Sequence, residues 1–237
     1  MDWDSAVSIV GHDIEIKTTY ENILMSTDGV DLFIDVGANY GTHSLLFMSH
    51  GVPTVSFEPN AECFPYHNAA CRLNSLSPNW MSAAVGSENG LAELVYPEGE
   101  TWHGSISPDV IGSAESSNAV RRTQVEVVTV DGFFTGSELL ANCKNILMKI
   151  DVEGAELEVL KGSRKIIKEK APLIIFESNE RQGRDALFEF MQEAEYVISE
   201  LPWQRSKVDQ ALNSEEFMGS SMTNFIAVPR RSAATQS

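Results

Sequence analysis

The stretch FIDVGANYGTH, at positions 33–43, has the composition of a turn that lets the backbone approach a ligand. An apolar run ends near Asp35, and Gly37 and Gly41 follow it. Glycine has no side chain to keep the backbone away from a bound molecule. In the dinucleotide-binding spacing G-x-G-x-x-G, a helix N-terminus faces a pyrophosphate. The carboxylate of Asp35 would repel a pyrophosphate, so this turn favours a cationic or zwitterionic ligand, such as one with a methionine-like ammonium group.

A second carboxylate is placed to recognise a nucleoside. Glu58 ends the run VSFEP, and an acid after the second strand of a doubly wound sheet can accept the hydroxyl protons of a ribose. Taken alone, either acid is equally well explained by a structural or surface role. Together and in this order, Asp35 and Glu58 favour S-adenosylmethionine over NAD, because the chain lacks the third glycine of the dinucleotide pattern.

A third group of charges lies in and after the segment NILMKIDVEG. Lys149 and Asp151 share one face of the expected strand, and Glu177 ends the next strand, PLIIFE. Charges within apolar strands are costly unless they are paired or functional. If the ligand is S-adenosylmethionine, transfer of its methyl group from the sulfonium would require an aligned acceptor oxygen and would be helped by removal of the acceptor's proton. Asp151 is therefore the first candidate for the general base or for orienting the acceptor hydroxyl, with Lys149 and Glu177 beside it.

Two other roles for these charges stay open. Lys149, Asp151 and Glu177 can form an ion-pair network that only closes the end of the sheet. Alternatively, Asp151, Glu177 and Glu153 can hold Mg²⁺, which prefers oxygen ligands, although the nearby lysine would compete with a metal. Glu153 is expected in the first turn of the following helix, where a negative charge is favourable to the helix dipole.

Two histidines are candidates outside this group. His103 lies in the irregular segment TWHGSISP and could act as a base at the acceptor site, because its pKa lies near neutrality. A solvated loop histidine is the alternative. His43 opens the helix after the glycine turn and is expected to pack or to cap there. Cys63, Cys71 and Cys143 show no CxxC spacing, so free thiols in a reducing compartment are expected.

These residues require a scaffold that brings the ends of several strands together. Strands are expected at 31–36, 52–59 and 79–86, alternating with helices at about 40–50 and 61–73. The remaining elements are expected as a strand at 145–151, a helix at 154–170, a strand at 172–177, a helix near 183–194, and late strands at 196–201 and 224–228. This order predicts a doubly wound, mostly parallel α/β sheet, in which ligands bind beyond the carboxyl ends of the strands.

Several segments together carry a family resemblance. They are FIDVGANYGTHS, VSFEPN, AAVG, VVTVD and, most specifically, MKIDVEGAELEVLKG with PLIIFE. Through them, over about residues 31–177, the sequence resembles the FkbM-type S-adenosylmethionine-dependent methyltransferases. The resemblance implies a Rossmann-like class I methyltransferase fold whose last strand is antiparallel. It also implies methyl transfer, usually to an oxygen, with hydroxyls of sugars, secondary metabolites and other small molecules as acceptors.

The resemblance also assigns residues to the cofactor, S-adenosylmethionine. In the family pattern Glu58 binds the ribose, Ala83 and Ala84 flank the adenine, and Asp151 borders the same pocket. The residues implied at the methionine end are Asp35, Gly37, Asn39, Tyr40 and Gly41. The chain departs from the pattern at its termini and in an inserted loop, so the resemblance does not define the acceptor.

One domain is expected. Residues 29–229 form the methyltransferase domain, with a Gly/Ser-rich inserted loop at 97–121 that is either functional or locally disordered. Residues 1–28 are expected to be a helical lead-in that could act as a lid over the pocket, and residues 230–237 a disordered tail. Acceptor specificity is expected in the loop and the lead-in, because such segments vary while the scaffold stays rigid.

Composition limits the partners. The chain has 237 residues and a formal charge of −17, which disfavours a nucleic-acid backbone or an anionic membrane surface as a partner. No apolar run approaches the ~20 residues of a membrane helix, and the acidic start is unlike a signal peptide, so a cytoplasmic enzyme is expected. The rival functions are a non-catalytic Rossmann-like binding module and an NAD-dependent oxidoreductase, for which no tyrosine–lysine catalytic pair is recognisable. The sequence indicates no oligomeric state.

Overall fold

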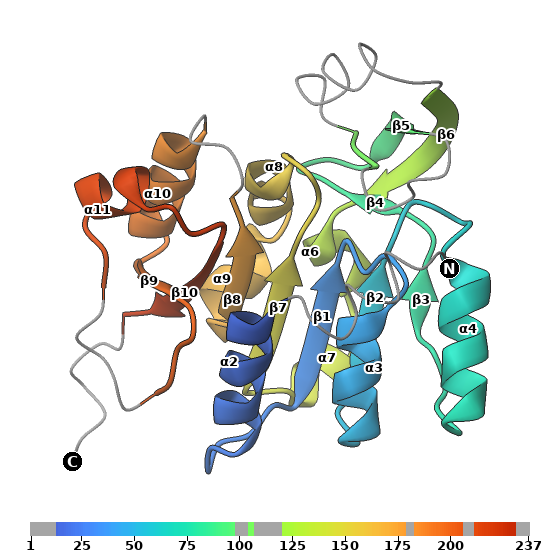
Figure 1. Ribbon diagram of the computed structural model, residues 1–237, viewed down its shortest axis with the longest axis horizontal. Helices are drawn as coiled ribbons and strands as arrows, with labels where there is room; N and C mark the ends of the chain where they lie inside the picture. Colours follow the sequence, from blue (N-terminus) through green and yellow to red (C-terminus); the bar gives the residue numbers. More distant parts are fainter. Residues whose placement is uncertain (1–12, 98–103, 107–119, 179–182, 206–210, 231–237) are drawn as a thin grey trace.

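The computed structural model describes residues 13–97, 104–106, 120–178, 183–205 and 211–230. Its main sheet has seven strands in the order β3-β2-β1-β7-β8-β10-β9, and a second sheet has the order β4-β6-β5. The second sheet stands beyond the carboxyl ends of the main strands (Figure 1). None of the described helices has the length and apolar character needed to cross a bilayer.

The main sheet confirms the predicted doubly wound topology. Its strands are β1 (Leu32–Val36), β2 (Thr54–Phe57), β3 (Trp80–Met81), β7 (Ile146–Ile150), β8 (Leu173–Glu177), β9 (Tyr196–Glu200) and β10 (Asn224–Pro229). The last strand, β10, runs antiparallel to both of its neighbours, β8 and β9, while the other pairs are parallel. The chain order reverses between β1 and β7, and such a switch point is where ligands bind in open α/β sheets.

Helices cover both faces of this sheet (Figure 1). They are α2 (Ile14–Leu24), α3 (Thr42–Ser49), α4 (Phe64–Leu73), α6 (Val130–Phe133), α7 (Glu138–Asn142), α8 (Glu156–Lys161), α9 (Arg164–Lys170), α10 (Arg184–Glu193) and α11 (Ser214–Gly219). On one face Phe33 and Leu147 pack with α2 and α3. On the other face Ile34 and Met148 pack with residues of α8 to α11. Burial on both faces explains why the central strands are almost continuously apolar.

The expected single helix over 154–170 is wrong, because it divides into α8 and α9. Gly162 ends α8 against the backbone of Gly86, whose carbonyl oxygen would lie 2.0 Å from a Cβ at position 162. The Asp131 carboxylate then accepts the backbone N–H groups of Lys165 and Ile166, at 2.8 and 2.9 Å, in the first turn of α9. An acid from a distant part of the chain therefore starts a new helix where the local pattern is continuous.

The expected third strand, 79–86, is also divided. Only Trp80–Met81 pairs with β2, as β3, whereas Ala84–Val85 forms β4 and pairs with β6 (Val120–Val128) in the second sheet. Strand β5 (Gly90–Pro97) pairs antiparallel with β6 along its whole length. The inserted segment 97–121 thus begins and ends in paired strands, and of its interior the structure describes residues 104–106.

The helical lead-in contributes to the core. Ile16, Tyr20 and Ile23 of α2 are at most 1% exposed and pack on the face of the sheet that carries Phe33 and Ile175. Helix α2 is therefore a layer of the fold. The lid role suggested for the lead-in stays a prediction, and residues 1–12 and 231–237 lie outside the described part of the chain.

Candidate active site

The glycine turn after β1 is pressed against the loop after β7. Gly37 has φ +81°, and a Cβ at this position would lie 1.7 Å from the carbonyl oxygen of Asp151. Gly41, with φ +77°, would place a Cβ 1.8 Å from Nδ1 of His67. Both positions therefore require glycine, for the backbone conformation and for space. The result is a turn of bare backbone at the switch point of the sheet.

Asp35 lies in β1 just before this turn and connects it to α3. It is completely buried, its Oδ2 accepts a hydrogen bond of 2.6 Å from the hydroxyl of Ser44 in α3, and that hydroxyl lies 2.7 Å from Oγ of Ser56. Within the described residues its Oδ1 has no hydrogen-bond partner. Asp35 stands opposite Lys149 in the pairing of β1 with β7. Direct contact between Asp35 and a ligand's ammonium group stays a prediction.

Glu58 connects the end of β2 to the glycine turn. Its Oε2 accepts the backbone N–H of Asn39, and its Oε1 accepts that of Asn60, both at 2.8 Å. Burial raises the pKa of Glu58 to about 7, against the lowering effect of these two hydrogen bonds. Each carboxylate oxygen keeps a further lone pair, so Glu58 can still accept hydroxyl protons.

The other residues predicted for the cofactor surround this point. Ala83 and Ala84 are buried where the chain leaves β3 for the second sheet. Asn39 has φ +47°, and its Oδ1 lies 3.4 Å from Sγ of Cys63. Tyr40 contacts the ring of Tyr66 edge-to-face, with centroids 5.2 Å apart. The structure thus brings together the turn, the end of β2 and the alanines after β3.

The charges at the ends of β7 and β8 form one network. Lys149 is only 2% exposed, and its Nζ donates to Oδ2 of Asp151 at 2.7 Å. Burial alone would lower the pKa of Lys149, but the carboxylates of Asp151 and Asp35 raise it to about 12. Burial and the adjacent Asp151 carboxylate raise the pKa of Glu177, which shares a hydrogen bond with Asp151. Although burial opposes it, Lys149 and this hydrogen bond lower the pKa of Asp151. The shared hydrogen bond thus favours the ionised form of Asp151 and the protonated form of Glu177.

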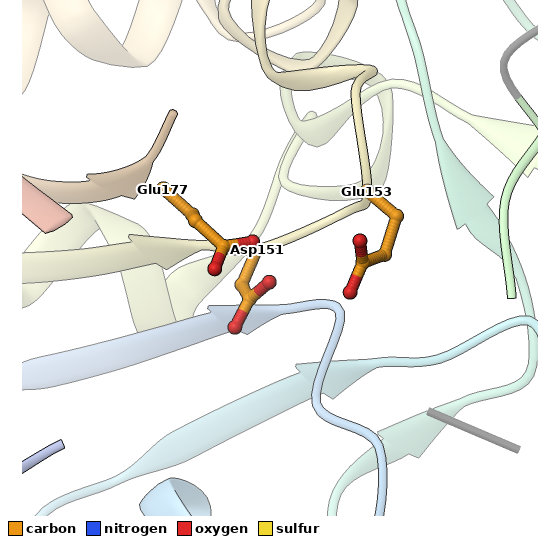
Figure 2. A group of neighbouring side chains, drawn as sticks. All are labelled: Asp151, Glu153 and Glu177. Carbon is orange, nitrogen blue, oxygen red and sulfur yellow. The ribbon is translucent and has the colours of Figure 1, made fainter. Parts of the chain in front are cut away.

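Glu153 joins this network from the loop, and its predicted place in a helix is wrong. Its backbone has φ +53°, Gly154 follows with φ +95°, and α8 begins only at Glu156. The Glu156 carboxylate accepts the N–H of Gly154 at 3.1 Å, and Ser105 Oγ donates to the Glu153 carbonyl at 2.8 Å. Oxygens of Glu153, Asp151 and Glu177 lie within 4.8 Å of one another (Figure 2). Burial and the charge of Asp151 raise the pKa of Glu153 to about 7.

Of the two candidate histidines, the structure describes His43 and not His103. His43 lies in α3, contacts the ring of Tyr20 edge-to-face and pairs with Asp13, with 3.6 Å between Nε2 and Oδ2. The expectation that it packs against its surroundings is confirmed, and its position beside the charge network could not be predicted from local sequence. His103 lies outside the described residues, so its role as an acceptor-site base stays a prediction.

A divalent cation fits this group less well than an ion pair does. Three carboxylate oxygens are close enough together to bind one ion, and carboxylates suit Mg²⁺. However, Lys149 already occupies Oδ2 of Asp151 and would compete with a cation. The arrangement has the contacts of a Lys–Asp–Glu network.

The raised pKa values predict that the ligand-free protein loses stability as pH increases. Glu58 and Glu153 have pKa values of about 7 against an ordinary value of 4.5, and the pKa of Glu177 is raised further. The folded state therefore binds protons that the unfolded state releases. Their stabilisation is complete below about pH 4.5 and is lost as pH rises through 7.

We expect urea unfolding to give a free energy on the order of a few kcal/mol lower at about pH 8.5 than at about pH 5.5. Glu58→Gln and Glu177→Gln should each reduce this slope, because the substituted amide does not titrate. A stability that is constant or rises over this range would contradict the assignment of the shifted carboxyls.

The strand order, the antiparallel β10, the glycine turn at the switch point and the acid after β2 define a class I S-adenosylmethionine-dependent methyltransferase fold. The chain belongs to the family described as the Methyltransferase FkbM domain, whose model matches residues 35–201. The NAD-linked oxidoreductase is thereby disfavoured.

The chain has similarity to several methyltransferases. The hexuronic acid methyltransferase AglP of Haloferax volcanii is 29% identical over 143 residues, which are 59% of this chain and 53% of that protein. The chain thus spans about half the length of this curated relative. A methyltransferase FkbM of Methylobacillus flagellatus KT superposes with a TM-score of 0.48 at 16% identity, over 84% of this chain and 43% of that one. A ribosomal protein L11 methylase of Lactobacillus delbrueckii subsp. bulgaricus gives 0.48 at 11% identity, over 94% and 81%.

Proposed function

We propose that this methyltransferase uses S-adenosylmethionine to methylate a hydroxyl oxygen of a small molecule, with a sugar as the first candidate. One observation carries the proposal: the side-chain-free turn at Gly37 touches the loop that carries the carboxylate network. A ligand on the turn and an acceptor at the network would therefore be neighbours. S-adenosylmethionine, when bound, supplies an electrophilic methyl group.

The residues at the glycine turn and the adjacent strand ends fit the parts of this cofactor. The two glycines leave a backbone cradle that a Cβ would fill, and Glu58 has free lone pairs for the hydroxyls of a ribose. Carboxylates outnumber cations around the turn, where Asp35 and Glu58 lie beside the pair of Lys149 and Asp151. This excess favours a positively charged ligand. The protein's own contribution to the chemistry is to orient the acceptor hydroxyl, to accept its proton and to exclude water.

A sugar acceptor is supported by the similarity to AglP, which is named as a hexuronic acid methyltransferase. To test it, the protein would be incubated with S-adenosylmethionine and a panel of hexoses, hexuronic acids and simple glycosides. We expect a mass increase of one methylene group, with the methyl placed on oxygen by NMR. Methylation of nitrogen, or of amino sugars only, would contradict the O-methylation proposal. A protein that binds the cofactor without turnover of any acceptor would favour the binding-module alternative.

Ligand-induced stabilisation is the simplest prediction of the cofactor assignment. Any ligand that prefers the folded state raises its stability by mass action, by about 2.7 kcal/mol at 100 times its Kd. For a domain of this size that corresponds to about 5–10 °C in Tm. We expect S-adenosylhomocysteine to give such a shift in a thermal melt and NAD to give none. A shift with NAD alone would reverse the assignment.

A further inference from the structure

The loop after β7 is the part of the charge network nearest to the glycine turn. A Cβ at Gly37 would meet not only the carbonyl of Asp151 but also Cγ1 of Val152, at 3.3 Å. A ligand that lies on the turn therefore borders the loop from Asp151 onward. Three carboxylates converge there, and Figure 2 shows that of Glu153 approaching from the loop and those of Asp151 and Glu177 from the strand ends. The three carboxylates differ in the hydrogen-bond and ion-pair partners that they already have.

The Asp151 carboxylate has two partners in the network, Lys149 and Glu177. Its Oδ2 accepts from Nζ of Lys149 at 2.7 Å, and it shares a hydrogen bond with Glu177. The lysine balances its charge and lowers its pKa. A carboxylate with a cation already beside it is a weaker acceptor for a proton or for a further cation than an unpaired one.

Glu153 is the carboxylate without such partners. Among the described residues its side chain forms no hydrogen bond and no ion pair, and it is partly exposed. Its backbone is nevertheless fixed, by Ser105 at its carbonyl and by Glu156 at the next residue. A non-glycine residue held at φ +53° is strained, and strain of this kind is common at functional sites. The loop is thus built to hold Glu153 in one place.

We propose that Glu153 is the carboxylate that faces the sulfur centre of the cofactor and receives the acceptor hydroxyl, and that Asp151 is a positioning residue. The inference rests on the proposed function and deepens it. The acceptor oxygen forms its bond to the methyl carbon as the carbon–sulfur bond breaks, with the electron pair left on sulfur. The hydroxyl proton passes to the Glu153 carboxylate.

Sinefungin tests this placement without any acceptor. It is a stable analogue in which a carbon bearing an ammonium group replaces the methylated sulfur. If Glu153 faces that centre, its carboxylate forms a charge-assisted contact with the ammonium group. S-adenosylhomocysteine has a neutral sulfur there and lacks this contact. The ratio of the two affinities, measured by calorimetry at one salt concentration, therefore reports the position of the carboxylate.

We expect Glu153→Gln to weaken sinefungin binding about tenfold or more, and S-adenosylhomocysteine binding less than about threefold. Asp151→Asn should change the affinity ratio less than Glu153→Gln does. Glu158→Gln is the matched control, because Glu158 lies in the adjacent helix and bonds to Ser87 and Lys161; this variant should leave the ratio unchanged. Glu153→Asp keeps the charge and should retain part of the preference for sinefungin.

Two failures can be told apart. If the wild-type protein binds neither nucleoside, the proposed function is wrong and the inference fails with it. If S-adenosylhomocysteine binds normally but Glu153→Gln leaves the ratio unchanged, only the inference is overturned. A ratio that falls in Asp151→Asn and not in Glu153→Gln would give the role to Asp151 instead. Because the Glu153 side chain has no partner to lose, its amide variant should remain folded, as a thermal melt will show.

Discussion

Replacing Gly37 by alanine is expected to reduce the affinity for S-adenosylhomocysteine by at least about 100-fold, which corresponds to about 2.7 kcal/mol. The new methyl group would lie 1.7 Å from the Asp151 carbonyl oxygen and 2.7 Å from its carbonyl carbon. These are backbone atoms, so no side-chain rotation relieves the clash. The turn and the loop after β7 must therefore move apart. This movement changes the backbone surface on which the ligand lies and also displaces Asp151. Calorimetric titration of the purified variant measures the loss.

Gly51→Ala is the matched control for this variant. Gly51 has φ +73°, close to the φ of +81° at Gly37, but a Cβ there meets nothing within 4 Å. Both substitutions therefore carry the strain of a left-handed alanine, about 1–2 kcal/mol, and only one carries the clash. Cofactor affinity should be unchanged in Gly51→Ala. Equal affinity in the two variants would show that the contact between the turn and the β7 loop does not form the binding site.

The sequence predicted those parts of the site that depend on a local period or a local conformation. The period of two placed Lys149 and Asp151 on one face of a strand, and their side chains are in contact. The glycines of the opening turn have the positive φ values that such a turn requires. The central strands are buried on both faces, so their apolar runs were long enough to locate each of them within a few residues.

The errors arose where a distant segment decides the local structure. The apolar run 79–86 reads as one strand, but its second half pairs with β6, which lies some forty residues later in the chain. The run 154–170 reads as one helix, but Asp131 caps its second half. Helical propensity at Glu153 is overridden by the hydrogen bond from Ser105 to its carbonyl and by that from the Gly154 N–H to Glu156. The contacts with β6, Asp131 and Ser105 come from distant segments, which no local pattern contains.

Several site residues were missed for the same reason. Ser105 belongs to the inserted segment, where periodicity is absent, and it reaches the Glu153 carbonyl from a bridge to Val95. Asp13, the residue just before α2, pairs with His43. Glu156 carried a weak signal, since an acid two residues after the flexible Gly154 can accept backbone N–H groups of the same loop. The charges and their approximate neighbourhood were predictable, whereas their partners depended on the tertiary structure.

Lys149→Met is expected to cause the largest loss of stability among the site variants, about 3–5 kcal/mol. The lysine side chain is 3% exposed and is the ion-pair partner of Asp151, and Asp35 stands beside it in the strand register. Methionine fills a similar volume but leaves the buried Asp35 and the partly exposed Asp151 without their cation, and an unpaired buried charge is costly. Urea unfolding at neutral pH measures the change.

The control variant is Lys161→Met, which removes an exposed ion pair with Glu158, where the side chains are 40% and 46% exposed. Exposed pairs contribute only about 0–1 kcal/mol, so a comparable loss in both variants would contradict the role of Lys149. The double variant Lys149→Met/Asp151→Asn should recover part of the stability, because one uncompensated charge is then absent.

The pH dependence of the Lys149→Met effect has a definite sign. Since Lys149 lowers the pKa of Asp151, the pair stabilises the fold above the ordinary aspartate pKa of about 3.9 and ceases to do so as pH falls below it. The difference between Lys149→Met and the wild type should therefore be large at pH 7 and shrink towards pH 3.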